Sequence, residues 1–170
     1  SAERIHAMIG FTRVYENFGM ASSDWQSVSE IIEDAFSEVT PGPVIVDIDI
    51  PKDLEIYADP LIRKVFVTLM ENAIRHGGTI TRIWFESGVK EGDLIISCSD
   101  DGVGIPSEEK EAIFTHGYGK HTGIGLFLAK EILSITGLSI RECGEPGKEA
   151  RFEIIVPENE YRFLSESEKK

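Results

Sequence analysis

The stretch MENAIRHGG, residues 70–78, closes a helical pattern and carries polar side chains at its edge. In the helix that it ends, at about 100° per residue, apolar side chains fill roughly half of the circumference. These are Ile62, Val65, Phe66, Leu69, Met70, Ala73 and Ile74. Asn72 lies just outside that arc, and Thr68, Arg75 and His76 share its stripe. Such a stripe can hold a hydrated metal ion and contact phosphate oxygens, although alone it is more typical of a solvated helix edge.

Two glycine-rich segments follow this helix. SDDGVGIP, residues 99–106, comes after an apolar strand pattern, and its glycines permit positive φ angles and close backbone approach. GYGKHTGIGLFLAKEI, residues 117–132, places glycines around the start of a long helix, whose free N–H groups suit a phosphate. It is not a Walker P-loop, because Lys120 is not followed by Ser or Thr. It is not a Rossmann fingerprint either, because no strand pattern leads directly into the glycines.

Composition narrows the range of partners. The 170 residues fit one compact domain plus an appendage, and 41% hydrophobic content is enough for a core. A net charge of −13 gives no general attraction for nucleic acid or for an anionic membrane. No apolar run has the length of a membrane span, and the N-terminus does not resemble a signal peptide. We therefore expect a cytoplasmic chain in which Cys98 and Cys143 are buried thiols.

The order of elements predicts an α+β fold. Helices are expected at residues 3–18, after an N-cap at Asp24, from an N-cap at Asp59 to His76, from Ser107, and at residues 124–136. Strands are expected at residues 44–51, 54–59, 79–87, 93–101, 138–144 and 149–157. This order predicts a two-layer α/β sandwich, with one mixed sheet and helices on one face. The polar residues 158–170 are expected to form a frayed tail.

Three of these segments, in this order and at this separation, resemble a known set of motifs. MENAIRH, DDGVGI and GKHTGIGLFLAKEI resemble the N, G1 and G2 boxes of sensor histidine kinases, whose ATP-binding domain shares the Bergerat fold with gyrase, Hsp90 and MutL. Ile113 and Phe114 resemble the F box, and GKEARFEIIVP resembles the last glycine box and terminal strand. The resemblance implies a catalytic ATP-binding domain at residues 23–157, after the end of a dimerisation and histidine-phosphotransfer hairpin at residues 1–22.

The resemblance also implies roles for individual residues. Asn72 would coordinate Mg²⁺ at the ATP phosphates, with Thr68 contributing through water. Glu71 would orient a water or the attacking imidazole, and Asp100 would accept a hydrogen bond from the adenine amine. The other ATP-binding residues implied are Arg75, His76, Gly102, Gly104, Ile105, Lys120, Thr122, Gly123, Ile124, Gly125 and Leu126.

The activity implied is transfer of the ATP γ-phosphate to a histidine, for relay to the receiver domain of a response regulator. The acceptor histidine of this family is usually followed by an acid on the first helix of the hairpin. None of His6, His76, His116 and His121 fits that description, so we expect the acceptor upstream of this sequence. The implied cofactors are ATP and Mg²⁺, and the implied partners are the kinase's own phosphoacceptor hairpin, a receiver domain and a second kinase subunit.

Three departures from the family pattern leave alternatives open. Thr68 stands where an asparagine is usual, the lid between Phe114 and Gly123 is short, and Glu149 with Ala150 replaces Gly-Thr. A non-catalytic nucleotide-binding module of the same fold is one alternative, because these departures could abolish transfer. An anti-sigma-type serine kinase is the other, although the helical pattern at the N-terminus counts against it.

Overall fold

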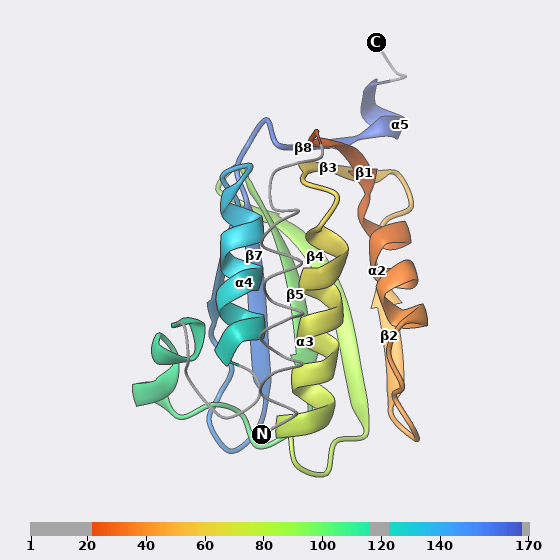
Figure 1. The fold of residues 1–170 in the computed structure, drawn as a ribbon. Coiled ribbons are helices and arrows are strands. Elements are labelled where there is room, and N and C mark those ends of the chain that lie inside the picture. Colours follow the sequence, from red (N-terminus) through yellow and green to blue (C-terminus); the bar gives the residue numbers. More distant parts are fainter. Residues whose placement is uncertain (1–21, 116–122, 168–170) are drawn as a thin grey trace.

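A five-stranded mixed sheet forms the centre of the molecule, in the order β2-β4-β5-β7-β6 (Figure 1). The computed structural model describes residues 22–115 and 123–167. β2 (Ile45–Asp49) runs parallel to β4 (Arg82–Lys90). The remaining neighbours, β5 (Asp93–Asp100), β7 (Ala150–Val156) and β6 (Ser139–Glu142), pair antiparallel. The predicted mixed sheet is therefore confirmed.

Three helices cover one face of this sheet (Figure 1). They are α2 (Val28–Ser37), α3 (Ile62–His76) and α4 (Gly123–Ser134), with α3 in contact with both others. The apolar arc of α3 is buried as predicted, apart from the half-buried Ile74. Phe66 of α3 meets Phe85 of β4 edge to face, with ring centroids 6.1 Å apart. Burial of each such side chain stabilises the fold by about 1.5–3 kcal/mol, so these contacts fix α3 against the sheet.

A second, three-stranded antiparallel sheet lies at the end of the molecule where α3 begins (Figure 1). It consists of β1 (Asp24–Ser27), β3 (Leu54–Ala58) and β8 (Tyr161–Phe163). The prediction of a single sheet was therefore wrong, and so was the prediction of a frayed tail. β8 pairs with β3, and the Tyr161 hydroxyl donates to the Gly92 carbonyl at 2.8 Å. The short helix α5 (Leu164–Ser167) follows β8.

Several predicted helix starts are shifted. Asp24 begins a strand instead of capping a helix, and the N-cap of α2 is Ser27, whose hydroxyl accepts from the Glu30 N–H. Asp59 does accept from the Leu61 N–H at 2.8 Å, but α3 begins after Leu61. The helix predicted from Ser107 is two separate 3₁₀ turns, η1 (Ser107–Glu109) and η2 (Ala112–Phe114).

The two thiols differ in their environment. Cys98 of β5 is buried as predicted, and burial raises the pKa of its thiol. Cys143 is exposed, so that prediction was wrong: it follows β6, whose alternation points Glu142 inward instead. The helix predicted at residues 3–18 lies outside the described residues.

Among residues 22–115 and 123–167, none of the helices has the length and apolar content of a bilayer-spanning segment.

Removal of β8 is expected to destabilise the domain. Deleting residues 158–170 leaves the β3 edge unpaired and removes the ion pair from Arg162 to Glu55, which has an N–O distance of 2.7 Å. We expect the free energy of unfolding in urea to fall by about 2–4 kcal/mol. Deleting only residues 165–170 retains β8 and is the control. Equal stability of the two truncated chains would show that β8 pairing contributes nothing.

Candidate functional site

The C-terminal end of α3 docks directly onto the turn after β5. The Val103 N–H donates to the Gly77 carbonyl at 3.0 Å. A Cβ atom placed on Gly102 would lie 2.3 Å from that carbonyl oxygen and 2.7 Å from the Gly77 Cα. Only a residue without a side chain fits there, so Gly102 is required by backbone packing. This contact brings the predicted polar end of α3 and the predicted DDGVG turn together.

Asp100 is the last residue of β5 and points into the protein. Its side chain accepts the Gly102 N–H at 2.8 Å, and the residue is only 4% exposed. Burial raises the pKa of this carboxyl above its ordinary value, and the nearby acids Asp101 and Glu142 act in the same direction. Hydrogen bonds from the backbone of Gly102 and Ala150 oppose that shift. The result is a fixed, buried acceptor at the edge of the turn.

The other side of the same turn packs against the connection between β6 and β7. Gly104 has a φ of 72°, and a Cβ there would lie 2.6 Å from the Glu149 carbonyl oxygen. The Gly147 N–H donates to the Val103 carbonyl at 2.7 Å. The last glycine box therefore supports the G1 turn through its backbone. Glu149 takes part through its carbonyl, so its departure from the family pattern does not prevent this contact.

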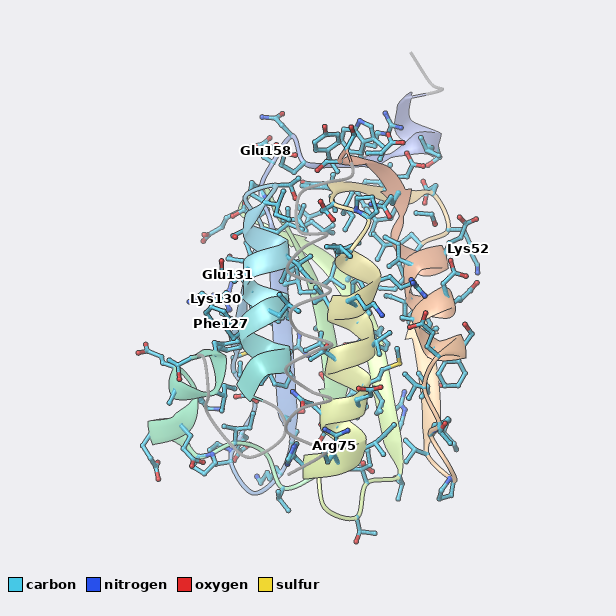
Figure 2. The ribbon with its side chains drawn as sticks, viewed as in Figure 1. Lys52, Arg75, Phe127, Lys130, Glu131 and Glu158 are labelled. Carbon is cyan, nitrogen blue, oxygen red and sulfur yellow. The ribbon has the colours of Figure 1, made fainter. Side chains whose placement is uncertain are left out.

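The polar stripe of α3 divides between buried and exposed positions. Asn72 is buried at 9% exposure and Thr68 is half-buried, whereas Glu71, Arg75 and His76 are exposed. Figure 2 shows Arg75 near the C-terminal end of α3, the end that meets the glycine turn. The buried amide of Asn72 is thus held on a rigid helix, with a cationic side chain one turn further on.

The start of α4 lies against this stripe. A Cβ on Gly125 would stand 3.2 Å from the Thr68 Cγ2, so the two helices meet closely at this point. Gly123 and Ile124 open α4, and Leu126 is buried. Ile105 packs half-buried against the core. The structure therefore gathers the N, G1 and G2 segments at one end of the sandwich; Lys120 and Thr122 lie outside the described residues.

Two polar clusters beside the site were not predicted. Asp101 accepts from the backbone N–H groups of Thr81 and Arg82 and from the Thr81 hydroxyl, which ties the start of β4 to the turn. Glu142 is buried and pairs with Lys110. The spacing of Ile140 and Glu142, two apart in a strand, could have indicated that Glu142 faces inward and needs a partner.

Carboxylate-rich metal binding is not a feature of the described residues. Within residues 22–115 and 123–167, His, Cys, Asp and Glu form no group of three or more able to hold a metal ion. On α3, the Asn72 amide and the Thr68 hydroxyl are neutral oxygen donors beside the start of α4. This donor set suits a hard cation that takes most of its ligands from elsewhere.

The end of α3, the DDGVG turn and the start of α4 therefore meet at one end of the sandwich, which is the arrangement that the sequence motifs implied. The model of the histidine kinase-, DNA gyrase B- and HSP90-like ATPase family matches residues 58–160, and the chain belongs to that family.

Named relatives are longer proteins. The chain is 32% identical to the adaptive-response sensory kinase SasA of Parasynechococcus marenigrum over 167 residues, which is 88% of the chain and 42% of that protein. It is 23% identical to the sensor protein KdpD of Escherichia coli, over 95% of the chain and 19% of that protein. The chain thus spans less than half the length of these relatives.

Solved structures agree with the fold. A nucleotide-free form of the catalytic domain of the histidine kinase ThkA superposes with a TM-score of 0.65 at 26% identity, covering 81% of the chain and 99% of that domain. Full-length ShkA in complex with AMPPNP gives a TM-score of 0.72 at 17% identity, covering 90% of the chain and 35% of ShkA. The second similarity concerns the fold alone.

Substitution of Gly102 is expected to separate the two halves of the site. In Gly102→Ala the new Cβ overlaps the Gly77 carbonyl, and we expect a loss of about 3 kcal/mol in the free energy of unfolding, measured in urea. Gly88→Ala is the matched control, because a Cβ there meets nothing within 4 Å. Similar stability of the two variants would contradict the tight packing of the glycine turn.

Proposed function

We propose that this chain is the ATP-binding catalytic domain of a two-component sensor histidine kinase. The observation that carries the proposal is the backbone contact of Gly77 with Gly102, which joins the helix bearing Asn72 to the turn bearing Asp100. Membership of the ATPase family and similarity to sensory kinases support it. In this proposal the domain transfers the γ-phosphate of ATP to a histidine that lies upstream of this sequence.

The adenine end of the site is assigned to the G1 turn. Asp100 is buried and already oriented by the Gly102 N–H, so its carboxylate can accept a hydrogen bond from the exocyclic amine of adenine without further ordering. Gly102 and Gly104 add no side chain at their own positions in the turn, and Ile105 offers apolar surface to the base. A buried acceptor of fixed orientation discriminates against a base that presents a carbonyl at that position.

The phosphate end of the site is assigned to α3 and α4. The free N–H groups at the start of α4, with Gly123, Ile124, Gly125 and Leu126, suit phosphate oxygens. The side chains that we assign to contact the nucleotide are Arg75, His76, Lys120 and Thr122.

Mg²⁺ fits the donors at this site. When bound, Mg²⁺ neutralises charge on the transferring phosphoryl group. Asn72 would hold it directly and Thr68 through water, with the remaining ligands from phosphates and solvent. A neutral amide adds no negative charge beside a triphosphate, which matters in a chain of net charge −13.

The chain's own residues act by positioning. In-line attack of an imidazole nitrogen on the γ-phosphorus forms the N–P bond while the bond to the bridging oxygen breaks and ADP leaves. Glu71 is exposed one residue before Asn72 and is assigned to orient the attacking imidazole or a water. The rigid helix, packed on the sheet through Phe66, supplies the fixed geometry that such a reaction requires.

The proposed partners follow from this chemistry. They are the kinase's own phosphoacceptor hairpin, to which residues 1–22 are assigned as the closing segment, a response-regulator receiver domain, and a second kinase subunit. The acidic balance of the chain argues against nucleic acid as a ligand. We place the domain in the cytoplasm, where ATP and receiver domains are available.

Transfer to histidine is tested by adding a separate hairpin that carries the acceptor histidine, with radiolabelled MgATP. We expect phosphate that is acid-labile and base-stable. Asn72→Ala should reduce transfer by about a hundredfold while ATP affinity falls much less, because the amide positions the metal. Lys64→Ala, exposed on the same helix, is the matched control. Acid-stable product would indicate a serine kinase, and ATP binding without transfer would indicate a non-catalytic module.

Adenine recognition by Asp100 is tested by its pH dependence. Burial raises the pKa of this carboxyl, so ATP affinity should decline on acidification at a higher pH than an ordinary aspartate would titrate. Asp100→Asn should weaken binding about tenfold or more and remove this part of the pH dependence, since it cannot titrate. Calorimetric titration across the pH range measures both. Identical pH profiles for the two proteins would contradict the assignment.

A further inference from the structure

A buried ion pair between Lys110 and Glu142 lies behind the G1 turn, the segment assigned to bind adenine. Glu142, at the end of β6, has a fully buried side chain, and the Lys110 side chain is only 21% exposed. Charged groups are rarely buried unless they are paired and fully hydrogen-bonded. Lys110 lies between the 3₁₀ turns η1 and η2, so the pair joins segments that are far apart in the sequence.

Both ends of the Glu142 carboxylate are engaged. One oxygen pairs with the Lys110 ammonium, and the other accepts the N–H groups of Gly144 at 3.1 Å and Arg151 at 2.9 Å. The Lys110 ammonium also donates to the Gly144 carbonyl at 2.8 Å. The Glu142 carboxylate therefore joins the two ends of the β6–β7 connection. Its ion pair with Lys110 attaches this connection to the segment that follows the G1 turn.

The connection that this pair closes is the surface on which the G1 turn rests. A Cβ on Gly104 would lie within 2.9 Å of the Glu145 carbonyl oxygen, and the Gly147 N–H donates to Val103. Displacement of residues 144–149 would therefore displace the turn that follows Asp100. The ion pair thus affects the position of the G1 turn, which is assigned to bind the base, without being part of that turn.

The other end of the pair leads towards α4. After Lys110 the chain forms η2, where Phe114 is buried and meets Phe152 of β7 with ring centroids 6.1 Å apart. η2 packs against α4, the helix whose start is assigned to the phosphates. Lys110 is therefore placed to hold the β6–β7 connection at a fixed position relative to α4.

We propose that Lys110 and Glu142 are positioning residues for the nucleotide, which hold the β6–β7 connection and, through it, the G1 turn in the geometry that binds adenine. This proposal rests on the proposed function. The exposed pair of Lys148 with Glu145 lies on the same connection and has side chains 73% and 63% exposed. Solvent-exposed pairs contribute little, so that pair has no such role.

The test is steady-state transfer to the acceptor hairpin at varied ATP concentration. In Lys110→Met, Glu142 becomes a buried charge without its cation, and we expect the KM for ATP to rise about tenfold or more with kcat within about twofold. Lys110→Arg keeps the cation and should return the KM to within about threefold of wild type. Lys148→Met is the matched control and should leave both constants unchanged.

A milder variant covers the case in which Lys110→Met does not fold. Glu142→Gln keeps an acceptor for backbone N–H groups and removes the charge that faces Lys110, so a KM increase of about threefold to fivefold is expected. An unchanged KM in Lys110→Met, or in Glu142→Gln where the former does not fold, would overturn the positioning role. So would a loss confined to kcat.

Failure of the proposed function is recognised separately. If the wild-type chain binds no ATP in calorimetry, the kinase assignment is wrong. The ion pair itself is then still measurable as protection of the Gly144 and Arg151 amides from hydrogen exchange in the nucleotide-free chain. If the wild-type chain binds ATP and Lys110→Met has the same KM for ATP, the positioning role alone is contradicted.

Discussion

The close approach of Gly77 to Gly102 is the constraint on which the rest of the site depends. At this point the end of a core helix and the turn after a central strand touch through their backbones, with an N–H to O=C bond of 3.0 Å from Val103 to Gly77. A side chain at position 102 would keep the two segments apart, because its Cβ would overlap the Gly77 carbonyl. Because α3 is packed on the sheet along its whole apolar face, this contact sets the separation of Asn72 from Asp100.

The acidic residues around the glycine turns shape the backbone. Asp100 accepts from Gly102, Asp101 accepts from Thr81 and its neighbour, and Glu142 accepts from two N–H groups of the β6–β7 connection. Carboxylates that accept several backbone N–H groups fix the conformation of turns. A chain of net charge −13 can thus carry the proposed phosphate site, because the acids nearest the turns are engaged internally and the groups proposed to contact phosphate are neutral or cationic.

Prediction from the sequence succeeded where the period was long and regular. The apolar arc of α3 is buried as expected, and β5 and β7, with eight and seven residues, form strands within the predicted ranges. Prediction failed for β1 and β8, which have four and three residues. Strands so short form only because β3 provides a hydrogen-bonding edge on each side. The residues of β1 and β8 themselves do not indicate this pairing.

The sequence by itself determined which groups are available: an amide on a helix edge, an aspartate before two glycines, and a glycine-started helix. It did so because helix and strand periods assign each side chain to a face. Only the tertiary structure decided that Gly102 rests on Gly77, that Glu142 needs Lys110, and that Cys143 faces solvent. Contacts between segments distant in the chain depend on how the helix layer packs on the sheet, and no local sequence pattern specifies that packing.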